Sequence, residues 1–214
     1  MGPAMDKIRV VIDQSVVEPG AKDGEIVCYG PNVMKGYHNK PEATKEIMTP
    51  DGGVRTGDRG RFDEDGFLWI TGRIKEQFKL ENGKYVFPVA LEEDICLNHY
   101  VQNAVIFGAN RPYNICMIVP DPTALDAYAQ KNNLSKDYKS LVENQAVQKM
   151  ITGEILDALK AKYGSYEIPK KFLFLSEPFT LENGMLTQTM KLKRKVITEK
   201  FGEQIEALFA AGEQ

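Results

Sequence analysis

An acidic and a basic side chain flank one short apolar hairpin in this chain. The acid, Asp58, ends an Arg-Thr-Gly-Asp motif at 55–58, and the base, Arg73, follows Gly72 at the far side of the hairpin. A carboxylate on a tight turn can accept hydrogen bonds from two adjacent hydroxyl groups, and a guanidinium from the next turn can reach the same sugar or its phosphate. The pair therefore suits a nucleotide ribose. The alternative is an ordinary turn aspartate and a solvated arginine at a strand end.

A lysine near the C-terminus could act on a phosphate. Lys191 lies at the tip of a polar loop at 186–194, and a Glu-Asn-Gly turn at 182–184 precedes this loop. A flexible point charge in such a place could follow a reacting phosphate. A patch for nucleic acid or anionic lipid, or a solvated helix start, is the alternative for the local basic cluster. This cluster comprises Lys191, Lys193, Arg194 and Lys195.

Together these segments resemble the adenylate-forming superfamily, which includes acyl-CoA synthetases, peptide-synthetase adenylation domains and luciferases. An ordered series of motifs carries the resemblance. The motifs are Gly-Glu at 24–25, Gly-Tyr at 36–37, Pro-Glu-Ala-Thr at 41–44, Thr-Gly-Asp at 56–58, Gly-Arg at 72–73 and Val-x-Pro-x-x-Leu-Glu at 86–92. Within the superfamily, the stretch 182–194 is similar to that of long-chain fatty acyl-CoA ligases. A long loop at 80–84 and a polar insert at 130–166 agree with that branch.

The resemblance implies an enzyme with a two-step reaction. In the first step the carboxylate of a fatty acid, expected to be long-chain, attacks the α-phosphate of Mg-ATP and gives acyl-AMP and pyrophosphate. In the second step the C-terminal domain rotates, and the thiol of CoA displaces AMP. ATP or AMP, CoA and Mg²⁺ are thus the implied cofactors, and the Mg²⁺ ligands are expected outside this chain. Fatty acid, ATP and CoA are the small-molecule partners.

The resemblance also implies catalytic and nucleotide-binding roles. Lys191 matches the family lysine that stabilises charge during adenylation, and Lys79 matches a residue that faces the active site only after rotation. Asp58 and Arg73 would hold the ribose. Arg194, like its neighbour Lys193, is expected to be solvated support for Lys191, with direct assistance by Arg194 as the alternative.

Two further positions take their roles from the family. Lys75 falls where relatives place the pivot of the rotation, and a plain surface lysine is the alternative. Gly83 falls where relatives keep a small residue, so that the pantetheine arm of CoA lies against the backbone. A simple turn glycine is the alternative there.

Two motifs of the superfamily are absent from the sequence. The Ser/Thr/Gly-rich loop that holds the phosphates of ATP and the Tyr-Gly-x-Thr-Glu motif that cradles adenine both normally precede the Gly-Glu strand. We therefore expect this chain to be the C-terminal part of a longer enzyme, with the N-terminal adenylation domain of the same protein as its partner and with no ligase turnover alone. The alternative is a stand-alone interaction or regulatory module that kept the fold without catalysis.

Composition indicates an ordinary globular protein. A hydrophobic content of 43% with 27% charged residues is globular, and 214 residues suffice for one large or two small domains. A net charge of −3 argues against a nucleic-acid scaffold, because phosphate backbones need a basic face. No apolar run approaches the roughly 20 residues that cross a bilayer, and no signal-peptide pattern begins the chain. We expect a cytoplasmic protein, with peripheral membrane contact left open.

Few residues could serve redox or metal chemistry. Cys28, Cys96 and Cys116 lie far apart within apolar strand or helix patterns, which favours reduced core thiols. His38 and His99 are isolated, so a zinc site or a histidine-based triad would be hard to assemble. We predict no metal site.

The elements that must position these groups follow from hydrophobic periodicity. Strand patterns at 7–12 and 25–29 and the hairpin at 61–71 predict a β-rich lobe over 1–73, the end of an N-terminal domain. After a hinge at about 73–75, a small mobile α+β C-terminal domain is expected over 76–214, with a central three-stranded sheet packed by helices. Its expected elements are strands at 84–87, 101–107, 115–119 and 172–175 and helices at 89–98, 124–132, 141–163 and 196–209.

Overall fold

The chain divides into two units, one formed by Met1–Gln77 and the other by Phe78–Gln214. The computed structural model describes residues 2–17 and 20–211. A β-rich lobe comes first and a unit of mixed strands and helices follows, which confirms the predicted α+β fold class. The division falls just after the hinge expected at 73–75, whose role as a pivot stays a prediction.

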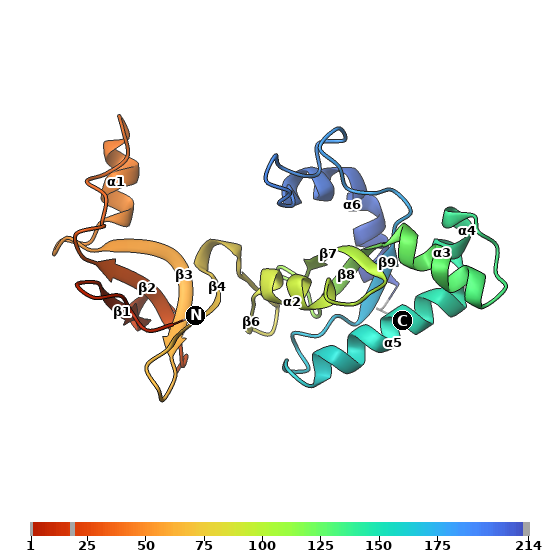
Figure 1. Ribbon diagram of the computed structural model, residues 1–214, viewed down its shortest axis with the longest axis horizontal. Helices are drawn as coiled ribbons and strands as arrows, with labels where there is room; N and C mark the ends of the chain where they lie inside the picture. The colour runs from red at the N-terminus through yellow and green to blue at the C-terminus, as the bar shows by residue number, and fades with distance from the viewer. Residues whose placement is uncertain (1, 18–19, 212–214) are drawn as a thin grey trace. The chain divides into compact units, whose positions relative to one another are not determined.

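The sheet of the first unit is an antiparallel meander in the order β1-β2-β3-β4 (Figure 1). Its strands are β1 (Arg9–Asp13), β2 (Gly24–Tyr29), β3 (Val54–Phe62) and β4 (Leu68–Arg73). A 3₁₀ turn, η1 (Gln14–Val16), follows β1. The short helix α1 (Pro41–Ile47) lies between β2 and β3 and begins at a proline, whose fixed φ suits the first helical position.

One aspartate closes the β3–β4 hairpin. Asp63 Oδ1 accepts a hydrogen bond from the Phe67 N–H at 2.8 Å, and Asp63 Oδ2 accepts one from Trp69 Nε1 at 2.6 Å. Gly66 takes the left-handed φ of +79°, which favours glycine. These contacts confirm the strand, turn and strand predicted at 61–71.

Strand β8 (Ile115–Pro120) is the central strand of the sheet in the second unit, between β7 (Val101–Phe107) and β9 (Lys171–Phe174). It pairs antiparallel with β7 and parallel with β9. All its residues are buried, as expected of a strand covered on both faces. A parallel pair requires a crossover connection. Here the crossover consists of α3 (Pro122–Lys131), α4 (Tyr138–Glu143) and α5 (Gln145–Lys160).

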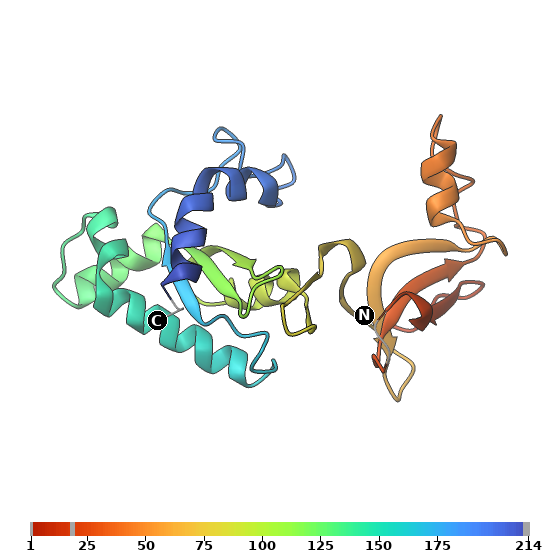
Figure 2. The same ribbon diagram turned by 180° about the vertical axis from the view of Figure 1, so that it is seen from behind.

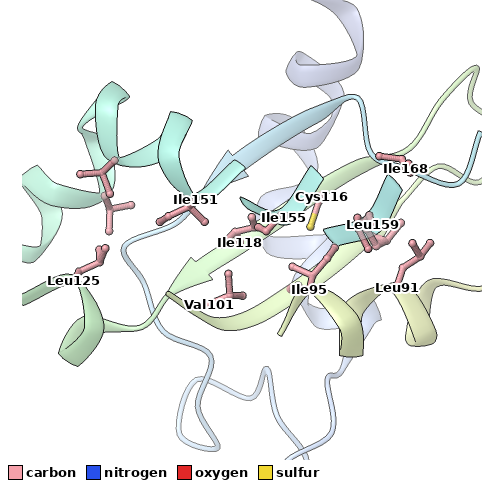
Figure 3. Packing of buried hydrophobic residues seen from close by; sticks show 14 of the residues in the cluster. Leu91, Ile95, Val101, Cys116, Ile118, Leu125, Ile151, Ile155, Leu159 and Ile168 are labelled. Carbon is pink, nitrogen blue, oxygen red and sulfur yellow. The ribbon is translucent and has the colours of Figure 1, made fainter. Parts of the chain in front are cut away.

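Two apolar cores form on opposite faces of this sheet, because alternate strand residues point to opposite sides. One face packs against α2 (Pro88–Ile95), α3, α4 and α5, and the other packs against α6 (Arg194–Ala210) (Figures 1 and 2). Buried residues of β7 and β8 on the first face are Val101, Ala104, Ile106, Cys116 and Ile118. Those on the second face are Val105, Ile115, Met117 and Val119. Figure 3 shows the first core, where side chains of α2 and α5 pack over β8.

Two helices replace the single helix expected at 141–163. The break lies at Asn144, which takes an extended conformation with φ −73° and ψ 116°. Its side-chain oxygen accepts hydrogen bonds from the N–H groups of Ala146 and Val147 and so caps the start of α5. The predicted apolar face is confirmed, since every fourth residue is buried: Val147, Ile151, Ile155 and Leu159. The stretch 130–166, expected as a polar insert, therefore contributes to the core.

A short ribbon begins the second unit. Strand β5 (Phe78–Lys79) pairs antiparallel with β6 (Tyr85–Val86), and the loop 80–84 joins them. Helix α2 follows and ends earlier than the predicted residue 98, because the Leu97 N–H bonds only three residues back in a tighter turn.

The cysteines are free thiols in different environments. Cys116 is buried in the first core and Cys28 is half-buried, but Cys96 is exposed. The prediction of three core thiols is therefore wrong for Cys96, an exposed residue that lies just past the end of α2.

Candidate functional site

Asp58 and Arg73 lie side by side on the sheet of the first unit. They are register partners on β3 and β4, and Arg73 Nε donates to Asp58 Oδ1 at 2.6 Å. The hydrogen bond and charge of Asp58 raise the pKa of Arg73 above its ordinary value. Half of the Arg73 side chain and a quarter of that of Asp58 are exposed, at 51% and 26%. The pair thus presents both acceptor and donor groups to solvent, and its binding of a ribose stays a prediction.

The Thr-Gly-Asp motif is part of strand β3, so the expected tight turn is wrong. The register between β2 and β3 shifts opposite this motif, and Gly57 takes the left-handed φ of +74°. Thr56 Oγ1 donates to the carbonyl oxygen of Ile26 at 2.8 Å and accepts from the Asp58 N–H at 3.1 Å. Such an irregularity in a strand redirects the side chain that follows it. The threonine and glycine therefore set the direction of Asp58.

A buried carboxylate supports this irregularity from β2. Glu25 is only 7% exposed, and its Oε1 accepts from the Gly57 N–H at 3.1 Å. Its Oε2 accepts from Arg55 Nη1 at 2.5 Å, and Arg55 Nη2 donates to Asp13 at 2.7 Å. Hydrogen bonds to Asp13 and Glu25 raise the pKa of Arg55. Sequence reasoning missed this role of Glu25, although a charged residue inside an apolar strand signals a buried partner.

Lys75 lies in the 3₁₀ turn η2 (Ile74–Glu76) that follows β4. Its side chain is 79% exposed, and its Nζ lies 3.0 Å from a carboxylate oxygen of Glu46. An exposed pair of this kind contributes little to stability. The position has the solvated character of the plain surface lysine, and the pivot role stays a prediction.

Lys79 and Gly83 lie close together on the ribbon of the second unit. Lys79 is exposed on β5, and its Nζ lies 5.7 Å from the centre of the Tyr85 ring across the ribbon. Gly83 has a φ of +85°, and a Cβ added there would come within 3.7 Å of Lys79 Cε. The backbone conformation alone therefore favours glycine, which supports the turn explanation. Contact with a pantetheine arm stays a prediction.

Lys191 projects from a loop that is closed by its own hydrogen bonds. Leu186 and Leu192 form an isolated antiparallel bridge at the base of the loop. The Thr187 N–H donates to the Lys191 carbonyl oxygen at 2.8 Å, and the Lys191 N–H donates to Thr187 Oγ1 at 3.0 Å. Met190 takes a left-handed φ of +60° to make the turn. The lysine is exposed, so its backbone is ordered while its amine faces solvent.

Arg194 is held by the protein, so the expectation of a solvated neighbour is wrong for this residue. Its Nη2 lies 2.8 and 2.7 Å from the two carboxylate oxygens of Glu92, and its Nη1 donates to the Ile106 carbonyl oxygen at 2.9 Å. Glu92 is 6% exposed, and its Oε1 also accepts from the Ile106 N–H at 2.6 Å. Lys193, by contrast, is exposed as expected.

A pattern in α2 could have revealed this ion pair. Glu92 occurs on the buried face of the helix together with Pro88, Leu91 and Ile95. A carboxylate at such a position requires a cation or several N–H donors, because an unpaired buried charge is costly. The sequence thus indicated that a partner exists but not which of the distant basic residues supplies it.

The predicted site residues fall into both units. Asp58, Arg73 and Lys75 belong to the first, whereas Lys79, Gly83 and Lys191 belong to the second. Over the described residues, 2–17 and 20–211, no three His, Cys, Asp or Glu side chains gather as a metal site would require. In the same part of the chain, every helix is too short or too polar to span a membrane.

The chain is similar in sequence to long-chain-fatty-acid–CoA ligases. Long-chain-fatty-acid–CoA ligase FadD15 of Mycobacterium tuberculosis is 40% identical over 192 residues, which cover 88% of this chain and 32% of that protein. Long-chain-fatty-acid–CoA ligase 5 of Mus musculus is 37% identical over 195 residues, covering 90% of this chain and 28% of that protein. The chain thus spans about a third of the length of these relatives.

Solved structures of adenylation domains share the fold. The adenylation domain of a carboxylate reductase from Mycobacterium chelonae is 28% identical with a TM-score of 0.75, covering 97% of this chain and 31% of that one. The A-PCP didomain of carboxylic acid reductase from Segniliparus rugosus, in complex with AMP, is 25% identical with a TM-score of 0.76, covering 98% and 28%. Residues 75–213 match the family model described as AMP-binding enzyme C-terminal domain. The chain therefore belongs to the AMP-binding enzyme C-terminal domain family.

Proposed function

We propose that this chain is the C-terminal part of an AMP-forming long-chain fatty acid–CoA ligase. The full-length enzyme activates a fatty acid with ATP to acyl-AMP and then transfers the acyl group to CoA. Relatives named as long-chain-fatty-acid–CoA ligases, at 40% and 37% identity, support this reaction class. The N-terminal adenylation domain of the same protein is the partner that completes the site.

The presentation of Lys191 is the observation that carries the proposal. In the first step, negative charge develops between the attacking carboxylate oxygen and the α-phosphate. A cation held against these atoms stabilises the transition state more than the ground state. The loop fixes the Lys191 backbone through Thr187 on both its N–H and its carbonyl oxygen, while the exposed amine keeps its reach.

The Asp58–Arg73 pair fits the nucleotide. Asp58 carries carboxylate oxygens that can accept from the two ribose hydroxyl groups, and Arg73 carries donors for the sugar or its phosphate. Their mutual bond of 2.6 Å orients both side chains before ATP or AMP binds. Mg²⁺, which accompanies ATP, is held by residues outside this chain.

The second step uses the ribbon at the start of the second unit. Rotation about Lys75 brings Lys79 to the adenylate, where its exposed amine assists the transfer to CoA. Gly83 leaves room beside Lys79 for the pantetheine arm, since its Cα carries no side chain. The exposure of Lys79 and the left-handed φ of Gly83 are compatible with these proposed roles.

Product analysis of the full-length protein tests this function. The protein is incubated with ATP, CoA, Mg²⁺ and an equimolar mixture of short-, medium- and long-chain fatty acids, and the acyl-CoA products are identified by mass spectrometry. We expect long-chain acyl-CoA with AMP and pyrophosphate in equal amounts, and no turnover by the 214-residue chain alone. Full-length protein without any acyl-CoA product would contradict the ligase, and acyl-CoA synthesis by this chain alone would contradict its dependence on an N-terminal domain.

A further inference from the structure

An arginine begins helix α6, where a cation is electrostatically unfavourable. Arg194 is the first residue of α6, and the preceding Lys193 makes no side-chain cap to the helix. The N-terminal end of a helix carries a partial positive charge, which repels a guanidinium. The carboxylate of Glu92, with both oxygens within 2.8 Å of Arg194 Nη2, offsets this repulsion. The position of the arginine therefore depends on a specific partner from another element.

The pair connects three elements of the second unit at one point. Glu92 belongs to α2, Ile106 to β7 and Arg194 to α6. Both polar backbone groups of Ile106 take part, because its N–H donates to Glu92 at 2.6 Å and its carbonyl oxygen accepts from Arg194 at 2.9 Å. This arrangement, called the Glu92–Arg194 clamp below, fixes the start of α6 to the sheet.

The same point is the base of the Lys191 loop. The Lys193 N–H donates to the Met185 carbonyl oxygen at 2.8 Å, and Leu192 bridges to Leu186. Met185 and Leu186 are buried in the second core, with 0% and 3% exposure. One side of the loop base is thus fixed by apolar packing, and the other side continues directly into Arg194.

We propose that the Glu92–Arg194 clamp positions Lys191 for the adenylation step, an inference that rests on the proposed function. Lys191 lies three residues before Arg194 in the sequence, and its long side chain is exposed to solvent. Electrostatic catalysis requires such a charge to be held in place, and a displacement of about 1 Å can lower a rate roughly 100-fold. Arg194 is a positioning residue in this account, because it contacts Glu92 and Ile106 and acts through Lys191.

If the clamp only stabilised the fold, its removal would affect the two half-reactions differently from the loss of a positioning role. If the clamp only stabilises the fold, its removal lowers adenylation and thioester formation together, in proportion to the folded fraction. If it positions Lys191, its removal lowers adenylation and spares thioester formation from preformed acyl-AMP. The two half-reactions therefore separate positioning from stability.

Variants of the full-length ligase test this inference. Arg194→Gln removes the charge, Arg194→Lys keeps the charge without the two-pronged donor, and Glu92→Gln keeps an acceptor for the Ile106 N–H. The matched control is Arg111→Gln, which breaks an exposed ion pair with Glu206 of helix α6. The two side chains lie 2.5 Å apart. Pyrophosphate release with ATP and a long-chain fatty acid measures adenylation. Acyl-CoA formation from synthetic acyl-AMP and CoA measures the second step.

We expect Arg194→Gln and Glu92→Gln to slow pyrophosphate release by about 30- to 100-fold, with thioester formation within about 2-fold of wild type. Arg194→Lys should be intermediate, and Arg111→Gln should leave both rates within about 2-fold. Equal losses in both half-reactions, or unchanged adenylation in either clamp variant that folds, would overturn the inference. Lys191→Ala, measured alongside, distinguishes the two proposals. If Lys191→Ala retains adenylation, the proposed role of Lys191 is wrong. If Lys191→Ala loses adenylation but Arg194→Gln retains it, only the proposed role of the clamp is wrong.

Discussion

At the residue scale, the candidate groups differ in how firmly the protein holds them. Asp58 and Arg73 bind each other at 2.6 Å on adjacent strands. Lys79 and Lys191 are both exposed, and in each case the backbone is hydrogen-bonded while the amine faces solvent. This contrast suits the roles proposed here, a nucleotide-binding pair that is preorganised and two lysines that each reach a reacting group in one of the two steps.

Lys79→Ala should impair thioester formation more than adenylation, which is the opposite of the effect expected for Lys191→Ala. In the full-length enzyme, we expect thioester formation from acyl-AMP to fall about 10-fold or more, because the lysine meets the adenylate only after rotation. Adenylation should change by less than about 3-fold. Lys139→Ala, at an exposed lysine of α4, is the control and should alter neither rate. An equal loss in both half-reactions would remove Lys79 from the second step.

At the element scale, a strand irregularity and two hydrogen-bonded loops position these residues. Strand β3 carries Asp58 just after the left-handed Gly57, and Glu25 on β2 supports the irregular stretch. In the second unit, the loop of Lys191 rests on the start of α6. Asp58 and the Lys191 loop thus each depend on contacts from a neighbouring element.

Loss of the Glu25 carboxylate should destabilise the first unit. Glu25→Ala leaves the Gly57 N–H without its acceptor and removes one partner of Arg55, so we expect the free energy of unfolding to fall by about 2 kcal/mol or more. Urea unfolding followed by Trp69 fluorescence reports this unit selectively, because Trp69 is the only tryptophan of the chain and lies on β4. Glu64→Ala, at an exposed turn position, is the control. Equal unfolding midpoints for Glu25→Ala and Glu64→Ala would contradict the role of Glu25.

The β3–β4 hairpin should weaken in acid through Asp63. The hydrogen bond from the Trp69 indole, and then that from the Phe67 N–H, hold the pKa of Asp63 below its ordinary value of 3.8. Since the folded pKa is lowered, the carboxylate stabilises the hairpin fully above the unfolded pKa. This stabilisation is lost as the pH falls through the lower, folded value.

Trp69 fluorescence measured against pH tests this expectation. The signal of the wild-type chain should change with a midpoint below 3.8, and Asp63→Asn should remove that transition because an amide does not titrate. The same acid transition in Asp63→Asn would assign it to another group.

Local patterns predicted most of the elements but few of the contacts between them. Periodicity gave β7 at 101–107, as observed, and identified the buried face of α5. It missed the break at Asn144, because the capping bonds of that side chain outweigh a continuous apolar spacing. It also missed the Glu92–Arg194 pair, whose members are 102 residues apart. A local pattern indicates which face of an element is buried but not which distant residue packs there.

At the scale of the whole molecule, residues assigned to the proposed function occur in each of the two units. The family match begins at residue 75 and covers the second unit except for its last residue, and the proposed nucleotide-binding pair, Asp58 and Arg73, precedes it. The curated relatives are about three times as long as this chain, which agrees with a proposed N-terminal partner domain. Catalysis in this account requires the full-length enzyme, with Lys191 serving the first step and Lys79 the second.

The rate of pyrophosphate release by Lys191→Ala in the full-length enzyme tests the central claim most directly. We predict that this rate falls by about two to three orders of magnitude, because the developing charge loses its cation, while acyl-CoA formation from synthetic acyl-AMP stays within about 3-fold. Lys195→Ala is the matched control, since Lys195 is a nearby lysine with an 89% exposed side chain, and it should behave as wild type. A Lys191→Ala enzyme that releases pyrophosphate at a near-wild-type rate would contradict the account.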